Sequence, residues 1–234
     1  MKVELPDINI QKRIAAVLSS IDAKIEKNEQ INNNLQQQAK TIFDAWFKDF
    51  EPFGGVLPNG WESATLGNIA EITSGKRPPA KSVVKTQEFS IPLIGAASIM
   101  GYTNAVLYDE KILITGRVGT HGVIQRLNHK CWASDNTLVI KSRFYEYVFQ
   151  VLQTIDYNSM NRGSTQPLIT QMDLKKIPLI LPTPDILDKF DCLVGGLMEK
   201  YENNIRENEQ LEALRDTLLP KLMSGEIDVS NIDI

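Results

Sequence analysis

A long amphipathic stretch near the start of the chain, residues 10–50, most constrains what this sequence can fold into. Its apolar residues recur at intervals of three and four, which is the spacing of one face of an α-helix. The positions on this face are Ile14, Val17, Leu18, Ile21, Ile25, Ile31, Leu35, Ala39 and Ile42, with the polar Asn28 among them. No proline or glycine interrupts the stretch, so we expect a helix of about 40 residues and about 60 Å. Such a rod is either a spacer or half of a helical pair, with a core helix of an ordinary bundle as the alternative.

The last segment of the chain repeats the first. Asn208-Glu209-Gln210 reproduces Asn28-Glu29-Gln30, and Pro184-Asp185-Ile186 resembles Pro6-Asp7-Ile8. The same apolar face continues through Val194, Leu197, Tyr201, Ile205, Leu211, Leu218 and Leu222, again with an asparagine, Asn208, in its centre. Both helices attach to one intervening domain, so we expect them to form an antiparallel pair. Such a pair would bring Asn28 and Asn208 together and fix the register, whereas a solvated Asn28 on the outer face is the alternative.

Between the two helices the pattern changes to short apolar runs separated by turns, which is typical of strands. We expect strands over residues 63–72, 89–95, 106–114, 122–126, 137–141 and 177–181, and helical turns over 145–155 and 171–176. The aromatic residues that end the first helix, Phe43, Trp46, Phe47 and Phe50, are expected to dock it on this domain. The predicted fold class is α+β, with one globular mixed α/β domain flanked by two long helices that form an antiparallel, coiled-coil-like pair. The expected domain boundaries are 1–57, 58–182 and 183–234.

The charge of the chain is unevenly distributed. The net charge is −4, but residues 58–178 hold thirteen Lys and Arg against nine Asp and Glu, whereas the remaining segments hold twelve against twenty. A domain with a net charge of +4 is suited to meet a phosphate backbone, and the acidic ends are suited to meet protein or water.

Composition also indicates the compartment. No apolar run approaches the roughly 20 residues of a membrane-spanning helix, and no signal-peptide core follows Met1. We therefore expect a cytoplasmic protein without membrane contact. Cys131 and Cys192 lie far apart in apolar surroundings typical of packed thiols, and no disulfide is expected.

Three loops of the middle segment concentrate side chains that bind nucleic acid. Residues 74–81 form a basic loop, residues 116–122 are glycine-rich and basic, and residues 161–167 are polar. Lys and Arg can neutralise phosphates, and Arg, Asn and Gln can each form two hydrogen bonds with a base edge. Ordinary solvated loops and a hairpin-like turn with positive φ at its glycines are the alternatives.

No catalytic set emerges. The glycine-rich loop lacks the Gly-Lys-Ser or Gly-Lys-Thr end of a P-loop, and no methyltransferase motif or glycine-rich S-adenosylmethionine loop is present. The two histidines, His121 and His129, have no neighbouring ligands at metal spacing. We therefore expect no cofactor, no metal site and no enzymatic activity.

The assembled motifs resemble the specificity subunit of type I restriction-modification enzymes. The motifs that carry this resemblance are Ile42-Phe43-Asp44-Ala45-Trp46-Phe47, Leu57-Pro58-Asn59-Gly60-Trp61, Leu66-Gly67-Asn68-Ile69-Ala70, Gly163-Ser164-Thr165-Gln166-Pro167, and Ile177-Pro178-Leu179 with Pro182. The resemblance implies a target-recognition domain at residues 58–182 that reads one part of a split DNA site. It also implies conserved helices that dock separate modification and restriction subunits. A full-length member has two such domains, so this chain is similar to a half-sized subunit or to a truncated one.

The resemblance and the loop chemistry together give the candidate residues. We assign Lys76, Arg77, Lys81 and Arg117 to phosphates, and we place His121, Asn161, Arg162, Ser164, Thr165 and Gln166 near bases, with Thr120 beside them. The expected partners are double-stranded DNA and the modification (methyltransferase) and restriction subunits. A homodimer through the long helices is left open. A coiled-coil scaffold protein that does not recognise DNA is the alternative function, and a stand-alone nuclease or methyltransferase is a more distant third.

Overall fold

The computed structural model describes residues 6–118, 120, 122–157, 159 and 168–229. The chain divides into two compact units, one formed by Met1–Thr41 with Gly195–Ile234 and the other by Ile42–Val194. The division falls inside two 40-residue helices, α1 (Ile8–Phe47) and α5 (Pro184–Met223). The predicted fold class, a mixed α/β domain between two long helices, is therefore confirmed. The predicted domain boundaries stay a prediction.

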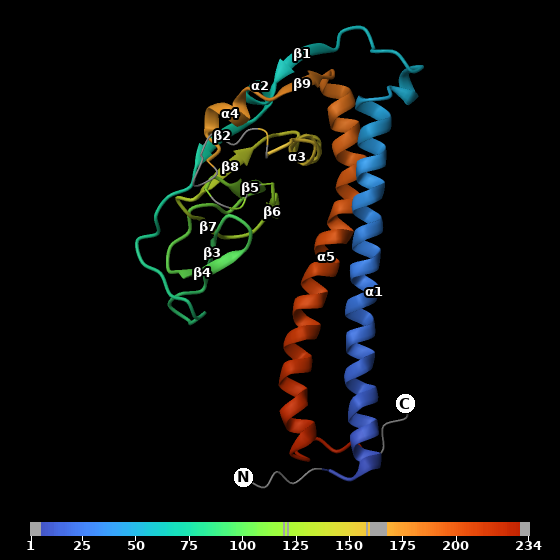
Figure 1. The fold of residues 1–234 in the computed structure, drawn as a ribbon, viewed down its shortest axis with the longest axis vertical. Coiled ribbons are helices and arrows are strands. Elements are labelled where there is room, and N and C mark those ends of the chain that lie inside the picture. Colours follow the sequence, from blue (N-terminus) through green and yellow to red (C-terminus); the bar gives the residue numbers. More distant parts are fainter. Residues whose placement is uncertain (1–5, 119, 121, 158, 160–167, 230–234) are drawn as a thin grey trace. The chain divides into compact units, whose positions relative to one another are not determined.

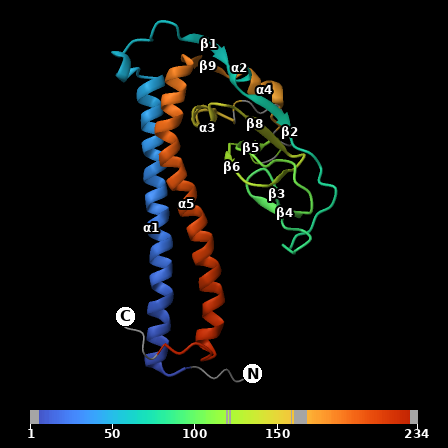
Figure 2. The same ribbon diagram turned by 180° about the vertical axis from the view of Figure 1, so that it is seen from behind.

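The first unit is an antiparallel helical pair, as expected. Asp22 of α1 bonds with Arg215 of α5, Asn28 with Asn208, and Asn32 with Asn204, each at 2.8 Å. Residue numbers rise along α1 as they fall along α5, so the two helices run in opposite directions. Figures 1 and 2 show α1 and α5 side by side in two opposite views.

The ends of α1 differ slightly from the expected residues 10–50. The Asp7 carboxylate accepts the backbone N–H groups of Asn9 at 2.8 Å and Ile10 at 3.1 Å, and this cap starts the helix at Ile8. At the other end Phe50 adopts a left-handed φ of 53°, which is incompatible with a continued α-helix. The helix accordingly stops at Phe47.

A layer of asparagines crosses the centre of the helical pair. The Asn28 side chain donates to Asn208 Oδ1 and to Glu207 Oε2, both at 2.8 Å. One turn further, Asn204 donates to Asn32 Oδ1 at 2.8 Å, and Asn32 donates to the Tyr201 carbonyl at 3.2 Å. Asn28 is only 1% exposed, which excludes the solvated alternative for this residue. The meeting of Asn28 with Asn208 is thus observed, and their role in fixing the register stays a prediction.

The described strands of the second unit form three sheets. β1 (Glu62–Thr65) pairs with β9 (Pro178–Leu181). A four-stranded antiparallel sheet has the order β2 (Glu71–Ser74), β8 (Thr137–Lys141), β5 (Ile112–Gly116) and β6 (Gln125–Leu127). A smaller sheet has the order β4 (Ile99–Thr103), β3 (Ile91–Ile94) and β7 (Trp132–Ala133). The short helices are η1 (Glu51–Phe53), α2 (Leu66–Ile69), α3 (Tyr145–Gln153) and α4 (Gln171–Lys175).

Three predicted strands were wrong in part. The run 122–126 is a strand only from Gln125 onward, where β6 begins. The run 63–72 is split by α2, because the Asn68 side chain accepts the Thr65 N–H at 2.8 Å and starts a helical turn there. The run 106–114 is a strand only from Ile112 onward, and Tyr108 forms an isolated bridge with Cys131. The short strands β4 and β7 were missed, since neither has a sustained alternation of apolar and polar residues.

Aromatic residues from both helix ends form part of the core of the second unit. Phe47 near the end of α1 lies 4.8 Å from Tyr147 and 4.9 Å from Phe190, measured between ring centroids. Trp61, which immediately precedes β1, lies 5.7 Å from Phe47. The predicted docking role of the aromatic residues at the end of α1 is confirmed within this unit. Phe50, the fourth of them, contacts Trp61.

Two further expectations concern the surface. Cys131 is buried as expected, but Cys192 is exposed on α5, so its predicted packing was wrong. Both cysteines are free. Among the described residues, no helix combines the length and the apolar character needed to cross a bilayer.

Replacing Asn28, Asn32, Asn204 and Asn208 with isoleucine is expected to raise the melting temperature of the helical pair and to loosen its register. Buried asparagines select one register at a cost in stability. The register can be read by cross-linking Asp22→Cys to Arg215→Cys with a short bismaleimide in a Cys192→Ser background, since the Arg215 side chain spans more than a disulfide can bridge. The yield of this cross-link should fall in the isoleucine variant, and it should be unchanged in a control with isoleucine at the exposed Asn33 and Asn203. An unchanged yield in both variants would show that another feature sets the register.

Candidate nucleic-acid interface

The turn between β7 and β8, residues 134–137, gathers two of the three loops that the sequence singled out. The backbone N–H of Lys76 donates to the Ala133 carbonyl at 2.9 Å, just before this turn. The N–H of Arg117 donates to the Asn136 carbonyl, within the turn, at 2.8 Å. The turn thus anchors the basic loop and the glycine-rich loop on one scaffold, although Lys76 and Arg117 lie far apart in the sequence.

Two glycines permit this close approach. The N–H of Gly75 donates to the Thr137 carbonyl at 3.1 Å, and a Cβ on Gly75 would overlap the carbonyl oxygen of Ser134. A Cβ on Gly116 would likewise overlap the carbonyl oxygen of Thr120, four residues further along the glycine-rich loop. Any side chain at Gly75 would push the basic loop away from the turn, and any side chain at Gly116 would push Thr120 out of its place.

The segment that follows the third loop pairs with the second one. The N–H of Ile169 donates to the Arg117 carbonyl at 3.0 Å, and Val118 forms a bridge with Leu168. The chain that follows residues 160–167 is therefore paired with the glycine-rich loop. His121, Asn161, Arg162, Ser164, Thr165 and Gln166 lie outside the described residues, so their assignment to bases stays a prediction.

The predicted phosphate-binding side chains differ in exposure. Lys76, Arg77 and Lys81 are exposed, and Arg117 is half-buried. Arg77 Nε lies 3.6 Å from Asp135 Oδ2, but its side chain is 87% exposed, and such pairs contribute little stability. Arg77 can therefore leave Asp135 for a phosphate at low cost. Thr120 is also exposed.

Lys81 stands apart from the other basic residues. The carbonyl of Ala80 accepts a hydrogen bond from Thr103 Oγ1 at 2.7 Å, and Ser82 pairs with Tyr102. Lys81 is thus fixed along β4, at the edge of the small sheet. The structure brings Lys76, Arg77 and Arg117 together around the 134–137 turn, and it places Lys81 on another sheet.

Sequence reasoning missed the 134–137 turn and its neighbour Trp132. The Trp132 indole N–H donates to the Lys76 carbonyl at 2.7 Å, which gives the basic loop a second anchor. The available signal was the run Ser134-Asp135-Asn136-Thr137, whose members favour turns because their side chains bond to nearby backbone groups.

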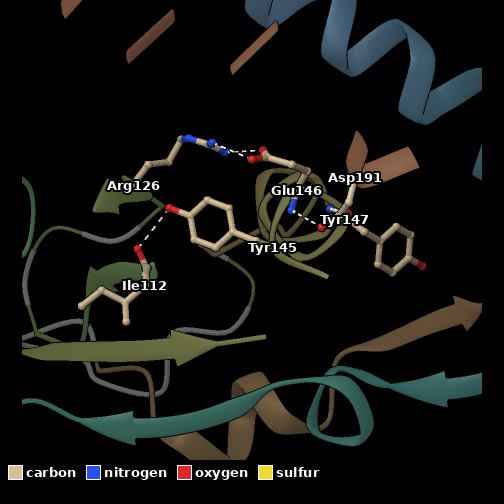
Figure 3. Close-up of polar contacts among 6 residues, drawn as sticks. All are labelled: Ile112, Arg126, Tyr145, Glu146, Tyr147 and Asp191. Carbon is tan, nitrogen blue, oxygen red and sulfur yellow. Dashed lines mark hydrogen bonds and ion pairs between the residues drawn. The ribbon is translucent and has the colours of Figure 1, made fainter. Parts of the chain in front are cut away.

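One arginine of the basic segment is part of the core. Arg126 forms two hydrogen bonds with Glu146, at 2.6 and 2.9 Å, and only 6% and 4% of the two side chains are exposed. The guanidinium also lies over the rings of Tyr145 and Phe149. Figure 3 shows this pair beside the hydrogen bond from the Tyr145 hydroxyl to the Ile112 carbonyl. Arg126 holds α3 against β6 and does not belong to the candidate interface.

The opposite end of the same network lies on α5. The carboxylate of Asp191 accepts the backbone N–H of Tyr147 at 3.0 Å and of Glu146 at 3.2 Å, and so caps the start of α3 (Figure 3). Burial raises the pKa of Asp191 from 3.8 to about 6, although these two hydrogen bonds favour the charged form. Repulsion from Glu146 and Asp188 adds to the increase.

The described residues do not suggest a metal site in place of a nucleic-acid interface. They contain no group of three or more His, Cys, Asp or Glu side chains that could hold a metal ion. The arrangement of the described loops is instead that of a rigid scaffold that carries exposed cations.

The fold places the chain in a class of known architecture. It superimposes on the crystal structure of the S subunit of a type I restriction-modification system from M. genitalium with a TM-score of 0.68, at 19% identity. The match covers 96% of this chain and 62% of that chain. At this identity the likeness concerns the fold.

Sequence comparison gives the family. The family model described as type I restriction modification DNA specificity domain matches residues 58–212. The chain is 28% identical to the type I restriction enzyme MjaIX specificity subunit of Methanocaldococcus jannaschii, over 99% of this chain and 62% of that relative. It is 22% identical to the HindI specificity subunit of Haemophilus influenzae, over 97% of this chain and 69% of that relative. The chain belongs to the DNA-specificity family of type I restriction-modification enzymes.

Two expectations from the sequence are thereby confirmed. The resemblance to specificity subunits is correct, and the match is to the DNA-specificity component and not to a modification or restriction enzyme. The chain spans about three fifths of the length of the M. jannaschii relative, 62%. The individual DNA contacts stay predictions.

The raised pKa of Asp191 has a measurable consequence. Between pH 4 and 6 the folded protein binds a proton that the unfolded chain does not, so stability falls as pH rises through this window. The free energy of unfolding of the wild type, relative to Asp191→Asn, should therefore decrease from pH 4 to 6 and level off above pH 7. Urea titrations at each pH measure this difference, and the ¹³C shift of the carboxyl should titrate near pH 6. A midpoint near 3.8 would contradict the burial of the charged group.

Proposed function

We propose that this chain recognises one part of a DNA target for a type I restriction-modification system and has no catalytic activity of its own. The single observation that carries this proposal is the gathering of the basic and glycine-rich loops on the 134–137 turn. Lys76, Arg77 and Arg117 would position the domain on phosphates. The polar residues 161–166 would read base edges from the adjoining loop.

Rigid anchoring supports a recognition role for these loops. Lys76 is held by two hydrogen bonds through its backbone, one from its N–H and one to its carbonyl, while its side chain stays exposed. Lys76 and Lys81 form no ion pair with any residue that the structure describes. Exposed cations on an ordered backbone can meet phosphates without a large cost in conformational entropy.

The helical pair suits a second task, the docking of partner subunits. A groove of about 400 Å³ lies between the helices, lined by polar and acidic residues that include Glu29, Gln36, Tyr201, Glu209 and Glu212. An acidic groove repels DNA and favours a protein surface. We infer that the modification and restriction subunits bind the helical pair. The length of the pair is also the observation that favours the alternative function, a scaffold protein that does not recognise DNA.

The length of the pair supports a further part of the proposal, a split target. Helices of 40 residues reach about 60 Å. Two recognition domains held by such a rod could contact major-groove segments one to two turns apart, at about 34 to 36 Å per turn. The second domain would come from another copy of this chain, related by a twofold axis, or from a further segment of the subunit.

Salt dependence of DNA binding tests the recognition role. For a random duplex, the plot of log K against log salt should be steep, and Lys76→Gln with Arg77→Gln should reduce its slope by about 2. The control is Lys12→Gln with Lys27→Gln, two exposed lysines of α1 with the same change in charge. Gel-shift titrations at low and moderate salt provide the measurement. An equal slope in both variants would remove Lys76 and Arg77 from the interface, and a flat wild-type curve would favour the scaffold function.

The split target is tested in cells. Methylome sequencing with and without this gene should reveal a modified motif in two parts, separated by a fixed gap, that appears only when the gene is present. Two identical domains would give an interrupted palindrome, and two different domains would give an asymmetric motif. A continuous motif, or no motif, would contradict the role of the helical pair as a ruler.

A further inference from the structure

An apolar side chain stands out to solvent in the segment that joins β2 to β3. Val83 is 87% exposed and the adjacent Val84 is 67% exposed. Isolated exposed apolar residues are common on protein surfaces. Val83 has the highest exposed fraction of the large apolar residues that the structure describes, and its backbone is unusually well held.

Hydrogen bonds on both sides hold Val83 in place. Ser82 and Tyr102 exchange two backbone hydrogen bonds, each of 2.8 Å, so the segment pairs with the edge of β4. The Ser82 hydroxyl then closes a turn around Val83, because it donates to the Val84 carbonyl at 2.7 Å and accepts the Val84 N–H at 3.1 Å. Thr103 fixes Ala80 at 2.7 Å. The turn is thus ordered before any partner binds.

A glycine of β4 makes this pairing possible. Gly101 has a φ of 152°, and a Cβ at this position would lie 2.6 Å from the Ser82 carbonyl oxygen. The segment could not approach β4 as closely with any other residue there. Val83 is itself β-branched, so its side chain has few rotamers to lose on binding. Backbone and side chain together form a stiff apolar tip.

The charges around the tip indicate its partner. Residues 76–88 contain four basic residues, Lys76, Arg77, Lys81 and Lys85, and one acidic residue, Glu88. Lys81 and Lys85 are exposed on either side of Val83 and form no ion pair with any described residue. This arrangement of cations favours a polyanion as the partner of the tip over a protein surface with few acidic residues.

We propose that Val83 contacts the methyl group of a thymine in the major groove, with Lys81 and Lys85 on the flanking phosphates. The thymine C5-methyl is the apolar group that a base pair displays in that groove. Val83 is then a specificity-determining residue in a loop that was otherwise assigned to phosphates alone. The proposal rests on the proposed function, since it requires that this domain reads DNA sequence.

Replacement of thymine by uracil tests the contact with this methyl group directly, because uracil differs from thymine only in lacking it. Duplexes are first enriched from a random pool on the full wild-type chain, and each thymine of the enriched sequence is then replaced singly by deoxyuridine. One replacement should weaken wild-type binding about fourfold, which corresponds to the loss of one methyl-sized apolar contact. Val83→Ala should weaken binding to the thymine duplex by a similar factor and should be insensitive to uracil at that position.

The controls separate this contact from general effects. Val56→Ala removes another valine of the same unit that is 66% exposed, and it should bind like the wild type at every position. Val83→Ala should leave binding to random duplex unchanged, because a methyl contact is not part of nonspecific binding. Thermal unfolding should be equal for both variants, since neither side chain is buried.

Three outcomes would overturn the inference. Equal sensitivity of wild type and Val83→Ala to every uracil would show that Val83 does not contact a thymine. The tip would then be expected to contact a protein subunit instead. An equal loss on enriched and random duplexes would place Val83 outside sequence recognition. A wild-type chain that enriches no sequence from the pool would overturn the inference together with the proposed function, whereas the first two outcomes leave that function intact.

Discussion

The antiparallel pairing of α1 with α5 is the constraint on which the rest of the structure depends. α1 leads into the second unit and α5 leads out of it, so the intervening chain must begin and end near the same place. The structure meets this condition with β1 and β9, the first and last strands of the unit, which pair in register from Glu62 with Leu181 to Thr65 with Pro178. The aromatic core then takes Phe47 from one helix and Phe190 from the other. The three candidate loops, residues 74–81, 116–122 and 161–167, all lie in the part of the chain between these two strands, β1 and β9.

The net charge of residues 58–178 says little about their surface until the position and the partner of each cation are known. Arg126 is neutralised in the core by Glu146, and Arg143 and Lys141 meet Asp188 and Glu110 at 2.6 Å. The cations that remain exposed and form no ion pair with any described residue include Lys76, Lys81 and Lys85, all on the segment between β2 and β3. A modest excess of +4 in the sequence therefore becomes a local concentration of charge on a few loops. Position, more than total charge, distinguishes the surface that can approach a phosphate backbone.

The long-range features of this fold could be predicted from the sequence, and several local ones could not. The repeat of Asn28-Glu29-Gln30 at Asn208-Glu209-Gln210 indicated an antiparallel pair, because helical periodicity persists over many turns and averages out local exceptions. The strand β8 was predicted with its observed bounds because its residues form a continuous apolar run that is buried in the structure. The split of residues 63–72 depended on one side-chain cap, that of Asn68, which competes with an equally plausible strand pattern. Likewise, nothing in the sequence near Lys76 indicated that Trp132 would hold it, since that contact joins residues 56 positions apart.

The separation of the two helices along the chain also sets the order in which the protein can fold. Asn28 meets Asn208 only after 180 further residues have been made. At the roughly 5 to 20 residues per second of protein synthesis, this interval lasts about 10 to 40 s. During that time the apolar face of α1 has no helical partner, whereas the second unit is completed by Val194 and can close first. The nascent chain therefore carries an unpaired amphipathic helix for many seconds, and the pairing of α1 with α5 is a late event.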